Sequence, residues 1–152
     1  MAKLNNFKSA ALTAGYRSGL EEKVGTQLEE VGCVALYEPF KISYTIPASN
    51  HTYTPDYELP NGIIIETKGR FVMEDRKKHL LVKKQHPDLD IRFVFANAKA
   101  KLRKGSPTTY ATWCEKNGFK YASKEVPQEW INEKANRKSI NATKSFLRNK
   151  SK

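Results

Sequence analysis

The stretch TPDYELPNGIIIETKG contains a turn that restricts how the chain on either side of it can fold. Pro60 suits position i+1 of a type I turn, Asn61 suits position i+2, and Gly62 suits a left-handed conformation at i+3. Together they predict a three-residue loop with a glycine bulge. We therefore expect an antiparallel hairpin in which residues 52–59 pair with residues 63–68.

The length of this loop decides which side chains share a face of the hairpin. With three loop residues, Asp56 lies directly opposite Glu66, and opposed Cβ atoms are ~4.5–5.5 Å apart. Lys68 follows Glu66 by two positions and projects from the same face. A two-residue Asn-Gly loop would instead pair Asp56 with Thr67 and turn Glu66 away. The register is thus a step that a structure can test.

Two opposed carboxylates repel each other, whereas a purely structural hairpin favours unlike charges at such a pair. A divalent cation removes the repulsion, and ligands that are all oxygens suit Mg²⁺. A metal there can lower the pKa of bound water and stabilise charge during phosphodiester hydrolysis. Lys68 could orient or deprotonate the water or neutralise developing charge, or it could simply be a cross-strand partner of an acid.

The charge of the chain points to a polyanionic partner. Its 152 residues suffice for one domain with a core, and they carry a net charge of +11. Nucleic acid is the leading partner, through phosphate contacts and counterion release, and a soluble basic protein is the alternative. No helix pattern combines a wide apolar face with a basic one, which disfavours a membrane surface. Cys33 and Cys114 are isolated thiols, as expected in a reducing cytoplasm, and we expect no signal peptide.

Hydrophobic periodicity and capping residues predict an α/β fold, a small mixed β-sheet flanked by helices. The chain is expected to begin with a flexible basic arm (1–17) and a helix from Ser18, in which Glu21 closes a capping box and which Gly32 ends. One strand, or two divided at Pro39, follows (33–46), then a connector (47–51) and the hairpin. The expected elements after the hairpin are a polar helix (74–86), a buried strand (91–97), a helix capped by Ser106 and ended by Gly118, a short strand (119–122) and a mobile basic tail (132–152).

A resemblance to a known family adds to these inferences. Pro55-Asp56 followed by Glu66-Thr67-Lys68 matches the PD-(D/E)xK pattern of the restriction-endonuclease-like superfamily. Longer strings resemble the phage endonuclease I family of Holliday-junction-resolving enzymes, and they cover roughly residues 16–131. These strings are RSGLEEK, IPASNHTYTPD, LPNGI, ETKG, DRKKHLL, QHP, LDIR and KGSPT.

The resemblance implies a junction-selective endodeoxyribonuclease that acts as a homodimer and uses Mg²⁺ or Mn²⁺, with two ions per active site. By family match, Asp56, Glu66 and Glu21 hold the metals and Lys68 completes the catalytic set. The alternative role of Glu21 is helix capping alone. The resemblance also implies a nuclease domain over residues 18–131 whose first part, 18–46, is exchanged between protomers through the connector. If the chain is phage-encoded, the host cytoplasm is its expected location.

Several further side chains are candidates for DNA contact, each with a structural alternative. His51 could touch a metal, water or phosphate, although a lone histidine in a turn-rich segment is more often structural. A basic helix face could grip phosphate or merely be solvated. The candidates are Tyr16, Arg17, His51, Arg76, Lys77, Lys83 and Lys84. A non-catalytic nucleic-acid-binding protein using the same basic faces is the alternative function.

Overall fold

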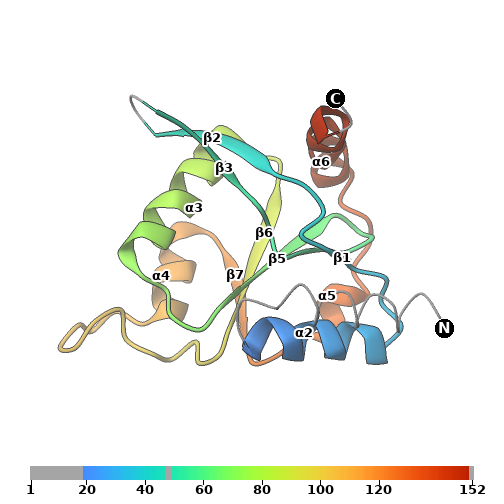
Figure 1. Cartoon of the computed structure of the whole chain (residues 1–152). Helices are drawn as coiled ribbons and strands as arrows, with labels where there is room; N and C mark the ends of the chain where they lie inside the picture. The colour runs from blue at the N-terminus through green and yellow to red at the C-terminus, as the bar shows by residue number, and fades with distance from the viewer. Residues whose placement is uncertain (1–18, 47–48, 151–152) are drawn as a thin grey trace.

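The structure of the chain is a computed structural model that describes residues 19–46 and 49–150, with side chains described as far as Leu147. The predicted arm of residues 1–17, the Ser18 cap, Tyr16 and Arg17 lie outside these ranges. Figure 1 shows the elements, whose bounds are α2 Gly19–Glu30, β1 Leu36–Tyr37, β2 Ile42–Ile46, β3 Ser49–Tyr53, β4 Tyr57–Glu58, β5 Ile63–Lys68, α3 Met73–Gln85, β6 Asp90–Phe95, α4 Tyr110–Asn117, β7 Lys120–Ser123, α5 Gln128–Ile131 and α6 Arg137–Lys150.

The centre of the fold is a five-stranded mixed sheet in the order β1-β4-β5-β6-β7. The pairs β1·β4 and β4·β5 are antiparallel, whereas β5·β6 and β6·β7 are parallel. Helices α3 and α4 lie over one side of the sheet, and α2 and α5 lie over the other (Figure 1). The α/β architecture predicted from the sequence is confirmed.

Strand β5 supplies apolar side chains to both faces of the sheet. Ile63 and Ile65 pack with Val24 of α2 and Trp130 of α5. Ile64 points the other way, into the cluster that contains residues of α3 and α4. Coverage of both faces explains why this strand is a continuous apolar run instead of an alternating one.

The hairpin forms in the predicted register, but the prediction that residues 52–59 form its first strand is wrong in part: only Tyr57–Glu58 pairs with β5, and residues 52 and 53 pair with β2. Tyr57 pairs with Ile65, and the N–H of Leu59 donates to the carbonyl of Ile63 over 2.8 Å. The N–H of Gly62 donates to Leu59 O over 3.0 Å, closing the turn, and Gly62 has a φ of +91°. A Cβ at Gly62 would also lie 2.8 Å from Cγ1 of Ile140, so backbone conformation and space both require glycine.

The segment between α2 and the hairpin contains two strands and not one, as the sequence allowed. Gly32 ends the first helix with a φ of +72°, and Pro39 lies between β1 and β2. The prediction that 47–51 is a connector is wrong in part, because Ser49–Tyr53 is strand β3. It pairs antiparallel with β2, from Ile42↔Tyr53 to Ile46↔Ser49, and these pairs use backbone groups that an extended connector would leave to water.

The fourth helix begins later than predicted. Ser106 is not its cap, because its hydroxyl accepts from the N–H of Thr108 within a turn. The N-cap is Thr109, whose hydroxyl accepts from Thr112 N–H in a reciprocal capping box. Before that point the chain forms a turn, in which Ser106 N–H donates to Arg103 O, and the hydrogen bond from Leu102 N–H to Thr108 O closes the loop at its base. Gly118 ends the helix in the left-handed conformation, as predicted.

The expectation of a mobile basic tail is wrong for the part that the structure describes. Helix α6 packs on the body of the protein, and Phe146 stacks on Phe40 with ring centroids 6.1 Å apart. The hydroxyl of Ser139 donates to Gly62 O over 2.6 Å and accepts from Asp90 N–H. Within the described residues, no helix is long and apolar enough to cross a membrane.

Candidate active site

The predicted acidic residues and lysine line one cleft of about 380 Å³ beside the end of strand β5. Glu21 comes from the first turn of α2, Asp56 directly precedes β4, and Glu66 and Lys68 lie on β5. The three carboxylates are almost fully buried, with exposed fractions of 5% for Glu21, 6% for Asp56 and 4% for Glu66. Buried acids normally have partners, so each partner matters for what the cleft can do.

Both carboxylate oxygens of Glu66 have neighbours that hold the side chain in place. The hydroxyl of Tyr53 donates to Oε1 over 2.7 Å. The Nζ of Lys68 lies 3.1 Å from Oε2. Tyr53 comes from β3, so the position of Glu66 depends on the small β2–β3 sheet as well as on its own strand.

Asp56 is fixed by the neighbouring strand and electrostatically strained. Its Oδ2 accepts from the backbone N–H and from the hydroxyl of Thr67. Burial, followed by the charges of Glu66 and Glu21, raises the pKa of Asp56 to about 8, although the hydrogen bonds from Thr67 oppose the rise. At neutral pH the isolated chain therefore tends to hold a proton on Asp56, as the repulsion argument predicts.

Glu21 is held in the cleft by tyrosines from the strands behind it. The hydroxyl of Tyr37 donates to Oε2 of Glu21 over 3.0 Å, and the hydroxyl of Tyr57 donates to its backbone carbonyl over 3.1 Å. These contacts hold the Glu21 side chain against the sheet. Ser18, the expected partner in a capping box, lies outside the described residues, so helix capping stays an alternative role.

Lys68 is held in its charged form. Burial alone would lower the pKa of Lys68, but the nearby carboxylates of Glu66 and Asp75 outweigh that effect and raise it. Asp75 Oδ1, from the first turn of α3, lies 3.5 Å from Nζ of Lys68. An ammonium fixed between two acids is well suited to neutralise negative charge and poorly suited to accept a proton.

A buried histidine lies behind the acids. His79 is 0% exposed, and neither ring nitrogen has a hydrogen-bond partner in the structure. Its Nε2 lies 4.0 Å from Oε2 of Glu66, and its ring packs edge-on against Tyr53 and Phe93. Burial, with the charges of Lys68 and Lys78, lowers the pKa of His79 well below its ordinary value, so the ring is neutral.

The donor chemistry of the cleft suits a divalent cation, although the ligand set is not closed in this arrangement. Within the described ranges, no three His, Cys, Asp or Glu side chains already form a group that could hold a metal ion. Thr67, Tyr53 and Lys68 occupy oxygens of Asp56 and Glu66. However, the acids offer only oxygen ligands, and a cation would relieve the repulsion from Glu66 and Glu21 that adds to the effect of burial on the pKa of Asp56.

The other predicted contact residues lie away from the cleft. His51 is on β3, with Nε2 2.8 Å from Ser49 Oγ, and it lines a separate open hollow of about 920 Å³ with Tyr44 and His86. Arg76 donates to Phe71 O, and Lys83 donates to Gly118 O. Lys77 and Lys84 are exposed on α3.

Several residues of this site were not predicted from the sequence. Tyr53, Asp75 and His79 contact Glu66 or Lys68, while Arg70 and Lys78 line the cleft as additional cations. No local pattern predicts these contacts, because β3, β5 and α3 meet only in the folded chain. The exception is Lys78, one turn after Asp75 on the basic helix, which helical spacing places near the same face.

Comparisons with known proteins identify the family of the chain. The family model of phage endonuclease I matches residues 1–151. Endonuclease I of Escherichia phage T7 is 57% identical over 126 residues, which cover 83% of this chain and 85% of the relative. Endodeoxyribonuclease 1 of Enterobacteria phage T3 is 56% identical over 118 residues, 78% of each chain. The chain belongs to the phage endonuclease I family.

Proposed function

We propose that this protein is a metal-dependent endodeoxyribonuclease that binds branched DNA, four-way junctions above all, and resolves it by paired phosphodiester hydrolysis. The relatives named above are an endonuclease and an endodeoxyribonuclease, which supports nuclease chemistry on DNA. Both are phage proteins, so the proposed place of action is the cytoplasm of an infected host cell.

One observation carries the chemical part of the proposal. Three nearly buried carboxylates, Glu21, Asp56 and Glu66, share a cleft with the charged Lys68 in a protein with a net charge of +11. A fold gains nothing from this arrangement, in which burial first, and then the charges of Glu66 and Glu21, raise the pKa of Asp56 to about 8. A cluster of strained acids inside a basic protein is typical of a site that binds cations and acts on phosphate.

The residues of the chain divide the work of hydrolysis. Glu21, Asp56 and Glu66 would hold Mg²⁺ or Mn²⁺, which supplies an activated water and stabilises charge on the phosphate when bound. Thr67 fixes the direction of the Asp56 carboxylate, and Tyr53 fixes that of Glu66. Lys68 remains protonated and places positive charge where the phosphate becomes more negative.

Binding and cleavage are separate tasks of the surface and the cleft. Positive charge outside the cleft attracts the phosphate backbone, and shape, not base contacts, selects a branch. The same surface would suit a protein that binds DNA without cutting it. That second function leaves the buried acids unexplained, so we favour the nuclease.

A homodimer matches the requirement for two cuts. A four-way junction has symmetry-related strands, and a two-fold dimer presents two equivalent sites to them. Residues 18–46 contribute Glu21, while residues after the connector contribute Asp56, Glu66 and Lys68. We propose that the first segment is exchanged between protomers, so that each site is built from both chains.

A supercoiled plasmid that extrudes a cruciform tests the function. We expect the protein to nick and linearise it in the presence of Mg²⁺ and not after the metal is chelated. A plasmid of the same length without the inverted repeat is the control for branch selectivity. Stable junction binding with no cleavage at any Mg²⁺ or Mn²⁺ concentration would establish the non-catalytic alternative.

A further inference from the structure

The loop after strand β6 starts with a turn, closed by the N–H of Ala100 donating to Asn97 O, and its side chains alternate between the core and the solvent. Ala98 is 4% exposed, and Ala100 and Leu102 pack against the core cluster. The residues between and after them, Lys99, Lys101 and Arg103, are exposed. The apolar side chains anchor the loop on the core, and the charged side chains between them lie in solvent. We call Lys99, Lys101 and Arg103 the basic ridge.

The backbone of the ridge is held by hydrogen bonds to the start of α4. Leu102 N–H donates to Thr108 O over 3.0 Å, and Tyr110 N–H donates to Ala100 O over 2.9 Å. Lys101 and Thr109 form an antiparallel bridge between these bonds. The ridge is therefore presented by a fixed backbone and not by a free loop, which limits the entropy lost when it binds a ligand.

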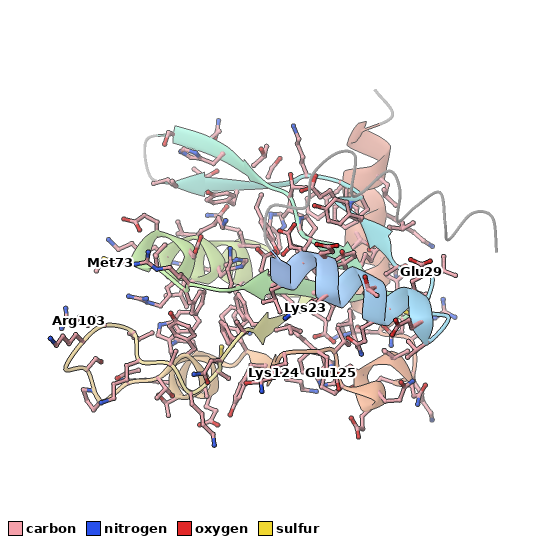
Figure 2. The ribbon with its side chains drawn as sticks, turned by 60° about the horizontal axis from the view of Figure 1, so that its bottom comes forward. Lys23, Glu29, Met73, Arg103, Lys124 and Glu125 are labelled. Carbon is pink, nitrogen blue, oxygen red and sulfur yellow. The ribbon has the colours of Figure 1, made fainter. Side chains whose placement is uncertain are left out.

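The ridge begins at the same edge of the sheet as the candidate active site. Lys68 pairs with Phe95 across β5 and β6, and Ala96 N–H donates to Lys68 O over 3.1 Å. The chain then leaves this edge toward Arg103. Figure 2 shows Arg103 at the tip of the projecting loop, on the same side of the molecule as Met73 at the start of α3.

The charges of the ridge have no acidic partner in the described part of the chain. None of the three cations forms an ion pair with a described Asp or Glu. Arg92, in contrast, is neutralised by Asp90 and Glu133 and serves the fold. Cations placed side by side on a fixed backbone repel one another, and an anionic ligand with several charges in a row would remove that cost.

We propose that the basic ridge binds the phosphate backbone of a duplex DNA arm that extends from the cleft across the sheet edge. The three cations of the ridge alternate with anchored apolar residues along one loop, and long flexible Lys and Arg side chains can each reach a separate phosphate along one DNA strand. The ridge makes no contact with the acids, so it contributes affinity and the direction of the arm, not chemistry. The proposal rests on the proposed function only in taking DNA as the ligand.

Charge-matched double variants test the ridge. Lys99→Gln/Lys101→Gln removes ridge charges, and Lys41→Gln/Lys116→Gln removes the same charge from exposed positions elsewhere. Affinity for a four-way junction is measured against salt concentration in metal-free buffer. We expect the plot of log K against log salt to become shallower by about 1.8 for the ridge variant, at ~0.9 per phosphate contact. The control variant should change the slope of this plot by a smaller amount.

Hydroxyl-radical footprinting on the same junction locates the contact. The ridge variant should lose protection on a duplex arm and keep protection at the branch, and Arg103→Gln should weaken the same patch. An unchanged footprint, or equal effects of the ridge and control variants, would overturn the proposal. A footprint on a linear duplex distinguishes a failure of the ridge proposal from a failure of the nuclease proposal. A protected patch that depends on the ridge supports DNA binding by the ridge, even if the wild-type protein fails to cut the cruciform plasmid.

Discussion

Oδ2 of Asp56 accepts two hydrogen bonds from Thr67, one from the backbone N–H and one from the hydroxyl, both of 2.8 Å. These two hydrogen bonds connect Asp56, which precedes β4, to strand β5 at a point just beyond the last residue pair of the β4–β5 ladder. Thr67 thus continues the hairpin through a side chain and aims the carboxylate into the cleft. These bonds favour the ionised form of Asp56, yet burial and the neighbouring acids still raise its pKa to about 8.

Replacing Asp56 by Asn should stabilise the metal-free protein, and more so as the pH rises. The ordinary pKa of the carboxyl is 3.8 and its folded value is about 8. Below the ordinary pKa the carboxyl is protonated in both the folded and the unfolded chain, so Asp56 does not lower the free energy of unfolding. Between the two values the unfolded chain loses the proton first, so the free energy of unfolding falls as pH rises, and the full penalty of several kcal/mol is reached above the folded pKa.

Thermal melts of wild type and Asp56→Asn in the presence of a chelator test whether the stabilisation grows as the pH rises. The gain in Tm should be larger at pH 8 than at pH 5. Asp88→Asn, at an exposed position, is the control for a surface carboxyl. A gain that does not depend on pH would contradict the strained state of Asp56.

Mg²⁺ should raise the Tm of wild type more than that of Asp56→Asn. A ligand that binds only the folded state raises Tm by mass action. We expect Mg²⁺ at pH 8 to stabilise wild type and to have little effect on Asp56→Asn, because the variant lacks one charged ligand. Isothermal calorimetry would give the affinities directly, and equal Mg²⁺ binding by both proteins would exclude Asp56 as a ligand.

Substitution of the cleft residues should separate cleavage from binding. Asp56→Ala, Glu66→Ala and Lys68→Ala are each expected to abolish cutting of a four-way junction while gel-shift affinity survives. Binding by the two acid variants should tighten, since a negative charge near phosphate is removed. Folded variants that no longer shift the junction would show that the cleft itself holds the DNA.

Phe146→Ala should weaken the fold, although the residue lies in a segment with a polar and basic sequence. The side chain is 8% exposed, stacks on Phe40 and packs edge-on against His86. Removing a buried phenylalanine side chain costs ~3–5 kcal/mol. Urea unfolding should show that loss, with Ser145→Ala on the exposed side as the control. A loss below ~1 kcal/mol would show that α6 does not belong to the core.

The hairpin was predictable because its determinants are local. Pro60, Asn61 and Gly62 each suit one backbone conformation, and together they set the register that brings Asp56 and Glu66 to one face. Helix α6 was not predictable in the same way. Its apolar residues are few, and they stabilise the fold only by packing on a surface formed by Gly62 and Phe40, which are far away in the sequence. The neighbours of Glu66 escaped prediction for the same reason.

The last prediction concerns how the sites are divided between protomers. In the single chain, β2 and β3 pair, and Glu21 reaches the cleft from the segment before them. If the link between these strands opens, residues 18–46 can make the same contacts on a partner, because an exchanged segment keeps its interface. Each active site would then take Glu21 from one chain and Asp56, Glu66 and Lys68 from the other.

Co-expression of a Glu21→Ala chain with a Lys68→Ala chain, followed by purification of the heterodimer, distinguishes the arrangements. With composite sites, both lesions fall in one site and the other site is intact, so the heterodimer should nick one strand of a cruciform plasmid. With sites built within single chains, each site carries one lesion and neither cuts. The two mutant homodimers are the controls, and both should be inactive in either case. A folded, junction-binding heterodimer with no nicking would therefore refute the exchange while leaving the nuclease assignment intact.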